Sequence, residues 1–211
     1  MKKGVLVCVL VVLISGLVAA PAAAAGQINF GLKAGASFSN VSWSDDDGSE
    51  KMLVRPTFGA FALFGLSPSL AVQIDLDYVT TGEWWQYLDL PKIVETFNYL
   101  HIPVVLKAKL VKEGKVVPFL LAGPAVNFLL SAKETGEDIK PWFKSIDFGP
   151  DLGAGVEMSA GEKMKVLLEA RFYLGLMNVY SPPDDIIMLS LAPVEYSMKN
   201  RALLVTLGLI F

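Results

Sequence analysis

Cysteine and histidine, which proteins use most for metal binding and nucleophilic chemistry, are nearly missing from this chain of 211 residues, which has one of each. The single cysteine, Cys8, lies in an apolar segment near the N-terminus, so the remainder can form no disulfide and no cysteine-based metal site. Acidic residues outnumber basic ones, 21 to 18, which argues against a basic surface for nucleic acid. We therefore expect no catalytic residue, no metal site, no cofactor and no nucleic acid partner.

The first 25 residues have the composition of a secretory signal peptide. Lys2 and Lys3 precede an apolar run over residues 5–20, and small residues follow as far as Ala25. Ala23 and Ala25 fit the small-x-small cleavage pattern, so we expect cleavage after Ala25. The alternative is an uncleaved membrane anchor, which the run of alanines disfavours. The expected organisation is a signal peptide over residues 1–25 and one domain over residues 26–211.

Beyond residue 25, only the stretch 116–132 is long and apolar enough to suggest a membrane helix. It contains Pro118, Gly123 and Pro124, and a proline removes a helix hydrogen bond and clashes with the preceding turn. Its length is also marginal for crossing a bilayer as a helix. We therefore expect no transmembrane helix in this stretch.

Apolar and polar residues instead alternate with a period of two, which is typical of strands with one apolar face. Leu168 and Ala170, for example, alternate with Glu169 and Arg171. Segments of this kind of about ten residues or more, if tilted, are long enough to cross a bilayer as strands. We count eight, at residues 27–41, 53–65, 70–83, 95–110, 116–131, 145–157, 164–177 and 199–211.

The connections between these segments alternate between short and long. Short turns are expected at residues 66–69, 112–115 and 159–162, and longer polar segments at residues 42–52, 86–95, 133–144 and 178–198. Outer-membrane barrels have short periplasmic turns and longer outer loops. The sequence therefore predicts an all-β fold, a closed eight-stranded antiparallel up-and-down transmembrane β-barrel with both termini in the periplasm.

A soluble lipocalin-like barrel would show the same alternation with its faces exchanged, but three features favour the membrane, the third being the aromatic end of the last segment. Glycines on the polar face would leave room for long side chains in a narrow barrel interior. Aromatic residues gather towards the two ends of the expected strands, as in the aromatic belts of membrane proteins. The expected outer belt contains Trp43, Trp84, Trp85, Trp142, Tyr87, Phe128, Phe143 and Tyr180, and the expected periplasmic belt contains Phe30, Phe64, Phe119 and Phe211.

The last segment ends on an aromatic residue after an alternating apolar row. Leu207, Leu209 and Phe211 in this row resemble the C-terminal signal that outer-membrane assembly machinery recognises. Because lipid offers no hydrogen-bond partners to the backbone, the first strand must pair with the last. The expected partners are therefore outer-membrane lipid and the assembly machinery, and the expected location is a bacterial outer membrane.

Five short stretches, spread over nearly the whole chain after residue 25, give it a resemblance to the PorT-like outer-membrane β-barrel family. They are Phe30–Gly35, Tyr99–Pro103, Pro118–Pro124, Leu168–Phe172 and Asn200–Ala202. The resemblance implies an eight-stranded barrel and brings no catalytic motif. Some members are linked to protein secretion or gliding machinery, so an accessory role in secretion is one function that the resemblance implies.

Charged and polar residues of the inward face should form a network inside the barrel. They include Asp75, Asp77, His101, Lys107, Asp151, Glu169 and Arg171. Isolated charges are costly in a narrow lumen, so we expect these side chains to pair and to form an ionic plug. The alternative is a narrow path for ions. His101 has no second histidine to share a metal and lies too deep to act as a catalytic base at the outer rim.

Two acidic groups, Asp45–Asp47 and Asp184–Asp185, fall in expected outer loops. Carboxylates can bind calcium, but the spacing of a calcium loop is missing and solvated charge is the simpler interpretation. Ser181, Pro182 and Pro183 could stiffen the last loop or present a tip for a ligand. We expect a non-enzymatic outer-membrane barrel whose loops contact a protein partner. The alternatives are a narrow, porin-like channel for ions or small solutes and an accessory barrel of secretion machinery.

Overall fold

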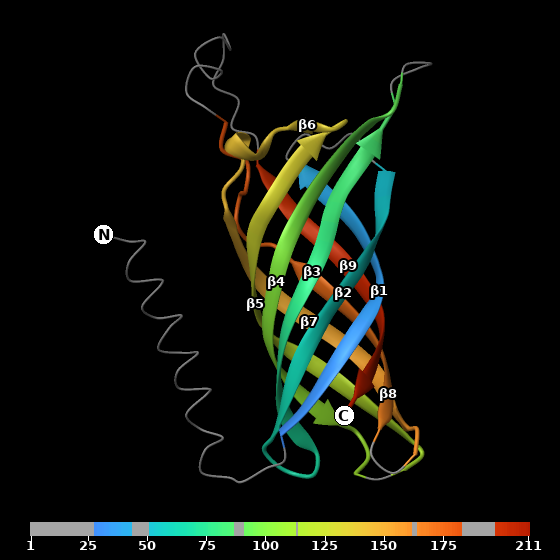
Figure 1. Cartoon of the computed structure of the whole chain (residues 1–211). Helices are drawn as coiled ribbons and strands as arrows, with labels where there is room; N and C mark the ends of the chain where they lie inside the picture. The colour runs from blue at the N-terminus through green and yellow to red at the C-terminus, as the bar shows by residue number, and fades with distance from the viewer. Residues whose placement is uncertain (1–27, 44–50, 87–90, 113, 162–163, 183–196) are drawn as a thin grey trace, which may run out of the picture.

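The chain folds into a tall barrel of tilted antiparallel strands, seen from the side in Figure 1. The computed structural model describes residues 28–43, 51–86, 91–112, 114–161, 164–182 and 197–211. Eight long strands form the wall, so the predicted fold class is confirmed. They are β1 (Ile28–Trp43), β2 (Lys51–Gly65), β3 (Leu70–Trp85), β4 (Ile93–Lys109), β5 (Val116–Glu134), β7 (Ile146–Ser159), β8 (Lys165–Leu174) and β9 (Met198–Ile210).

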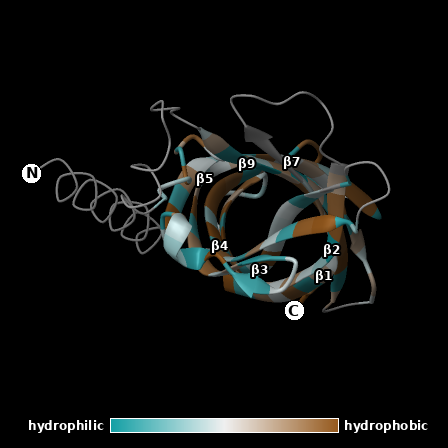
Figure 2. Cartoon of the chain, turned by 90° about the horizontal axis from the view of Figure 1, so that it is seen from above, coloured by the Kyte–Doolittle hydropathy of each residue, from teal (hydrophilic) through white to brown (hydrophobic). Residues whose placement is uncertain are grey.

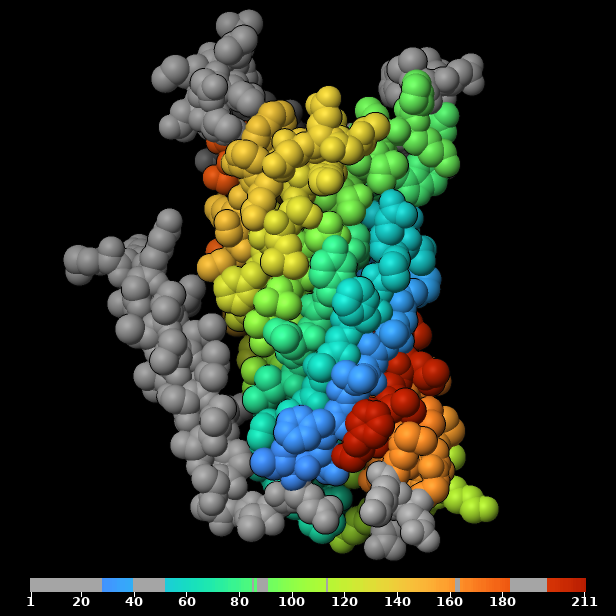
Figure 3. Space-filling model, viewed as in Figure 1, coloured from blue at the N-terminus to red at the C-terminus, as the bar shows by residue number. Residues whose placement is uncertain are grey.

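The sheet closes on itself, so the long strands leave no open edge. The strand order is β4-β3-β2-β1-β9-β8-β7-β5, and an additional pairing of β4 with β5 completes the ring. The strands form a closed ring when viewed from above in Figure 2. In the space-filling view of Figure 3, β9 lies directly against β1, in the register Ala34 to Leu207. Closure satisfies the backbone N–H and C=O groups, which lipid would leave without partners.

Short and long connections lie at opposite ends of the barrel. The turns that join β2 to β3, β4 to β5 and β7 to β8 share the lower end in Figure 1 with the start of β1 and the end of β9. We call this the short-turn end and the opposite end the outer end. The expected signal peptide and the acidic groups Asp45–Asp47 and Asp184–Asp185 lie outside the described residues.

The segment 133–144, expected to be a polar loop, contains two short elements at the outer end. The strand β6 (Glu137–Asp138) pairs with the end of β5, and a single 3-10 turn, η2 (Lys140–Trp142), follows it. Ile139 between them is buried, and its N–H donates to the carbonyl of Ala132. The described part of the chain holds no helix long and apolar enough to span a membrane.

Outward side chains form an apolar band around the barrel. Leu32, Leu152 and Leu207 are each more than half exposed on this face. Towards the outer end of β3, β4 and β5 the band stops at a polar row, in which Thr80 Oγ1 donates to Asn98 Oδ1 at 2.7 Å and Asn98 Nδ2 donates to Ser131 Oγ at 2.8 Å. Apolar exposure on this scale is what a lipid-facing surface requires and what a soluble barrel avoids.

The predicted aromatic belts are wrong in part. Phe119, assigned to the periplasmic belt, is 1% exposed and points into the lumen. Phe143 is buried at the outer end, where Trp142 and Tyr180 pack against it, because the segment that follows β8 folds over this end of the lumen. Phe30 and Phe211 of the predicted periplasmic belt are exposed on the outer face. Phe58, which was not assigned to a belt, is also exposed and stacks on Tyr78 with 5.2 Å between ring centroids.

Candidate functional site: a layered lumen

Inward side chains fill the barrel in three layers. The ionic layer lies about halfway along the strands and contains Lys33, Asp75, Asp77, His101, Asp151, Glu169 and Arg171, all at most 5% exposed. The outer layer contains Phe97, Tyr99, Leu129, Ala132, Ile139, Phe143, Val179 and Met198. The short-turn layer contains Phe61, Leu63, Val105, Phe119, Leu121, Leu167 and Ile210.

Lys33 of β1 is a central cation of the ionic layer. Its Nζ lies 2.8 Å from Asp75 Oδ1, 2.9 Å from Asp77 Oδ2 and 3.5 Å from Glu169 Oε1. The sequence prediction did not include Lys33 among the network residues. Its place in the alternation, between Leu32 and Ala34, puts it on the inward face and could have identified it.

Arg171 of β8 is the second cation, and it joins strands on opposite sides of the barrel. Its Nη1 donates to Asp75 Oδ2 at 3.1 Å, and its Nε lies 2.5 Å from Glu169 Oε1. A longer contact of 3.8 Å joins Nη1 to Asp151 Oδ2 on β7. The guanidinium donates through Nη1 and Nη2 to the two oxygens of Asp75, and its charge also faces Glu169 and Asp151.

His101 of β4 is hydrogen bonded through both ring nitrogens. Nδ1 lies 2.6 Å from Asn127 Oδ1 and Nε2 lies 3.0 Å from Asp151 Oδ2. The edge of its ring also meets Tyr173, with 5.2 Å between centroids. These contacts make His101 a positioned member of the network. Among the described residues, His, Asp and Glu side chains form no group that could hold a metal ion.

One glycine makes room for this layer. Gly59 of β2 lies opposite Asp77 of β3. A Cβ atom at Gly59 would overlap the Asp77 carboxylate and the backbone carbonyl of Leu76. The small residue therefore lets the Asp77 carboxylate occupy the space that leads to Lys33.

Lys107, predicted to belong to the same network, lies elsewhere. Its Nζ is 2.6 Å from Glu157 Oε1 and 3.9 Å from the centroid of the Phe119 ring. The register places it near the short-turn end of β4, opposite Leu121 on β5. The residues predicted to form one network thus belong to two clusters, the ionic layer and a lysine cluster at the short-turn mouth.

The segment that follows β8 completes the outer layer. After β8 ends at Leu174, Val179 turns into the barrel, its N–H donating to the carbonyl of Met198 at 3.0 Å. The carbonyl of Val179 accepts from the N–H of Lys144 at 2.8 Å. This segment therefore fixes Val179 and Phe143 over the outer end of the lumen.

The chain matches one protein family and several solved structures. The family described as "Outer membrane protein beta-barrel domain" matches residues 20–181. A search of curated protein sequences gives no significant match.

Two solved structures have the same overall fold. The neisserial surface protein A is 14% identical with a TM-score of 0.53, and the alignment covers 86% of this chain and 95% of that protein. The outer membrane protein OprG of Pseudomonas aeruginosa is 10% identical with a TM-score of 0.54, covering 88% and 97% of the two chains. At these identities the likeness concerns the fold alone.

Proposed function

The chain belongs to the outer membrane protein beta-barrel domain family, and we propose that it is a non-enzymatic, non-conducting barrel that acts through its outer end. The observation that carries this proposal is the layered lumen. Two apolar layers enclose an ionic layer in which Lys33 and Arg171 are paired with carboxylates. Long connections at the outer end are then the part of the barrel available for a protein partner.

The short-turn layer supports the absence of conduction. Val105 and Leu167 are 0% exposed, and Phe61 and Phe119 are at most 3% exposed. An ion that passed between these apolar side chains would lose most of its water, and the nearest charged groups, Lys107 and Glu157, already pair with each other, so passage would be costly. This packing favours a closed barrel over a narrow channel for ions or small solutes.

Planar-bilayer recording of the purified full chain tests the proposal. The wild-type protein should give no stable single-channel steps. A double variant, Phe61→Gly with Phe119→Gly, opens the short-turn layer and should raise the current if the layer is the barrier. Slower migration of boiled than unboiled samples on an SDS gel confirms that each protein is folded. Regular conductance steps from the wild-type protein would overturn the proposal in favour of the channel.

The proposed orientation places the short turns in the periplasm and the outer end at the cell surface, as in other outer-membrane barrels. Ser67 in a short turn and Glu137 at the outer end are both exposed. Cysteines introduced singly at these positions can be labelled on intact cells with a maleimide that does not cross membranes. Glu137→Cys should react on intact cells and Ser67→Cys only after lysis, whereas the reverse result would contradict this orientation.

The resemblance to the PorT-like family supports a more specific form of the proposal, an accessory role in protein secretion. A strain without the chain should then secrete less protein, and the wild-type gene should restore secretion. Unchanged secretion would leave the general interaction role and exclude the specific one.

A further inference from the structure

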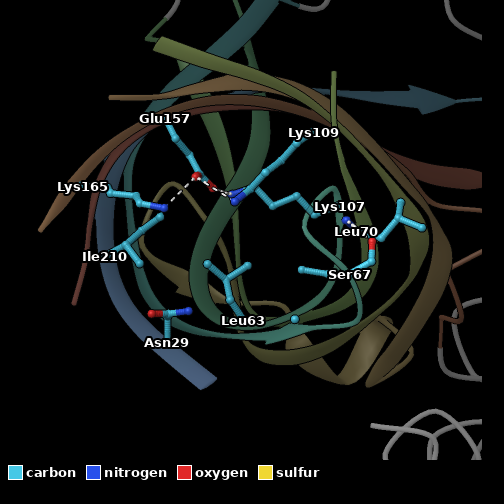
Figure 4. A pocket seen from close by; sticks show the side chains of 11 residues that line it. Asn29, Leu63, Ser67, Leu70, Lys107, Lys109, Glu157, Lys165 and Ile210 are labelled. Atoms are coloured by element: carbon cyan, nitrogen blue, oxygen red, sulfur yellow. Dashed lines mark hydrogen bonds and ion pairs between the residues drawn. The ribbon is translucent and has the colours of Figure 1, made fainter. Parts of the chain in front are cut away.

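Lysine side chains converge on one carboxylate at the short-turn mouth of the barrel, as the close-up in Figure 4 shows. Glu157 of β7 is the centre of this group, and its side chain is 3% exposed. Lys107 Nζ lies 2.6 Å from Oε1, whereas Lys109 Nζ and Lys165 Nζ lie 3.6 and 3.8 Å from Oε2. Three cations on β4 and β8 therefore share one anion.

The three lysines are not equivalent. Lys107 is fully buried and within hydrogen-bond distance of the carboxylate, so its charge is matched by Glu157. The side chains of Lys109 and Lys165 are 24% and 47% exposed, and their contacts with Glu157 are longer than a hydrogen bond. Each ammonium group has three donors, so these two lysines have donors to offer a further acceptor.

Space for such an acceptor lies beside them. A cavity of about 230 Å³ is lined by Lys109, Lys112, Gly114, Val117, Glu157, Ser159 and Lys165. A smaller cavity of about 80 Å³ shares Lys109, Glu157 and Lys165 with it and reaches Lys107. One water occupies roughly 30 Å³ in the liquid. The larger cavity therefore has room for several waters or for one small oxyanion.

We propose that the short-turn mouth is an oxyanion site for a phosphate group, held between Lys109 and Lys165 with Lys112 at the entrance. Lys107 balances the negative charge of Glu157. Lys109 and Lys165 therefore contribute the surplus positive charge of the site. A compact ammonium binds phosphate as a point charge without fixed geometry, which suits two lysines on different strands. Free phosphate and the phosphate of a lipid headgroup have this chemistry in common.

The proposal goes beyond the proposed function, because the site is at the opposite mouth and needs no conduction. Binding of inorganic phosphate to the full chain in a neutral detergent can be measured by isothermal titration calorimetry at low salt. The double variant Lys109→Gln with Lys165→Gln loses two charged donors to the anion and should bind phosphate at least about tenfold more weakly. Replacing both lysines by arginine should keep the affinity within a few fold.

The matched control removes the same charge from the outer end. Lys133→Gln with Lys199→Gln changes two exposed lysines there and should leave phosphate binding unchanged. A second titration uses micelles of the same detergent that contain phosphatidic acid. Binding to these micelles alone, lost in the Lys109→Gln with Lys165→Gln variant, assigns the site to a lipid headgroup, and binding of inorganic phosphate assigns it to the free anion.

Three results would overturn the proposal. In the first, phosphate binds neither as the free ion nor in the micelle. In the second, the Lys109→Gln with Lys165→Gln variant binds phosphate as tightly as the wild type. In the third, this variant and the Lys133→Gln with Lys199→Gln control lose the same affinity. The last result would mean that net charge alone attracts the anion. Migration of unboiled samples on an SDS gel shows whether each variant has folded.

Discussion

The ionic layer and the short-turn layer fill the same lumen by different means. In the ionic layer, Arg171 and Lys33 need carboxylates at particular positions on other strands, within about 3 Å. In the short-turn layer, Phe119 and Leu167 need only neighbours of suitable volume. Paired charges therefore require particular side chains at particular depths on facing strands, whereas apolar packing requires only that the space is filled.

The largest effect should come from breaking the ionic layer. Replacing Arg171 with alanine leaves Asp75 and Glu169 buried without one of their cations. Loss of one partner from a buried ion pair costs about 3 to 5 kcal/mol. The unfolding midpoint of the purified barrel in detergent should fall strongly. The exposed Arg55→Ala is the control, and an unchanged midpoint for Arg171→Ala would show that the network does not hold the barrel together.

An intermediate effect should come from the short-turn layer. Leu167 is fully buried in the lumen, and its neighbour Leu168 is 45% exposed on the outer face of the same strand. Leu167→Ala should cost about 3 kcal/mol because it opens a cavity. Leu168→Ala should cost less, because detergent or lipid fills the space. Equal losses in denaturant unfolding would contradict the assignment of the two faces.

The smallest effect should come from the outer rim, where carboxylates of neighbouring strands lie opposite one another. Glu95 is 6% exposed and lies opposite Glu83 on β3 and Glu134 on β5. Like charges at directly opposed positions are destabilising, so Glu95→Gln should stabilise the barrel by up to about 1 kcal/mol at pH 9, where the opposed carboxyl groups are ionised.

Lowering the pH tests the origin of this gain. At about pH 3 most carboxyl groups are protonated, so the advantage of Glu95→Gln should disappear there. Glu137→Gln, at an exposed position, should have little effect at either pH. A gain that persists in acid would mean that packing of the amide, and not relief of repulsion, stabilises the variant.

Strand positions could be predicted closely because alternation is a local property of the chain. The predicted segment 116–131 corresponds to β5, and the predicted segment 53–65 corresponds to β2. The end of β8 was less accurate, since the segment predicted over 164–177 leaves the ladder after Leu174. There the N–H of Gly175 donates to Asn200 and that of Leu176 to Phe148, bonds to distant strands that no local pattern contains.

The contents of the lumen were harder to predict than its wall. Alternation places Lys33, Lys107 and Arg171 on the inward face, but it does not say at what depth each one lies. Depth depends on the stagger of the strands around the closed barrel, which is set by all the registers together. For this reason the prediction merged Lys107 with Arg171 and did not separate the apolar layers from the charged one.

Alternation along the chain is enough to define the number of long strands, their two faces and the apolar band, because a strand with a period of two needs no distant partner to define its faces. Which inward residues meet depends on the closed barrel. Closure brings Lys33, Asp75 and Arg171 together from three strands, and it leaves Lys107 with Glu157 at the short-turn mouth. Pairing energy depends on distances of a few ångströms, and the stagger of the closed sheet sets those distances.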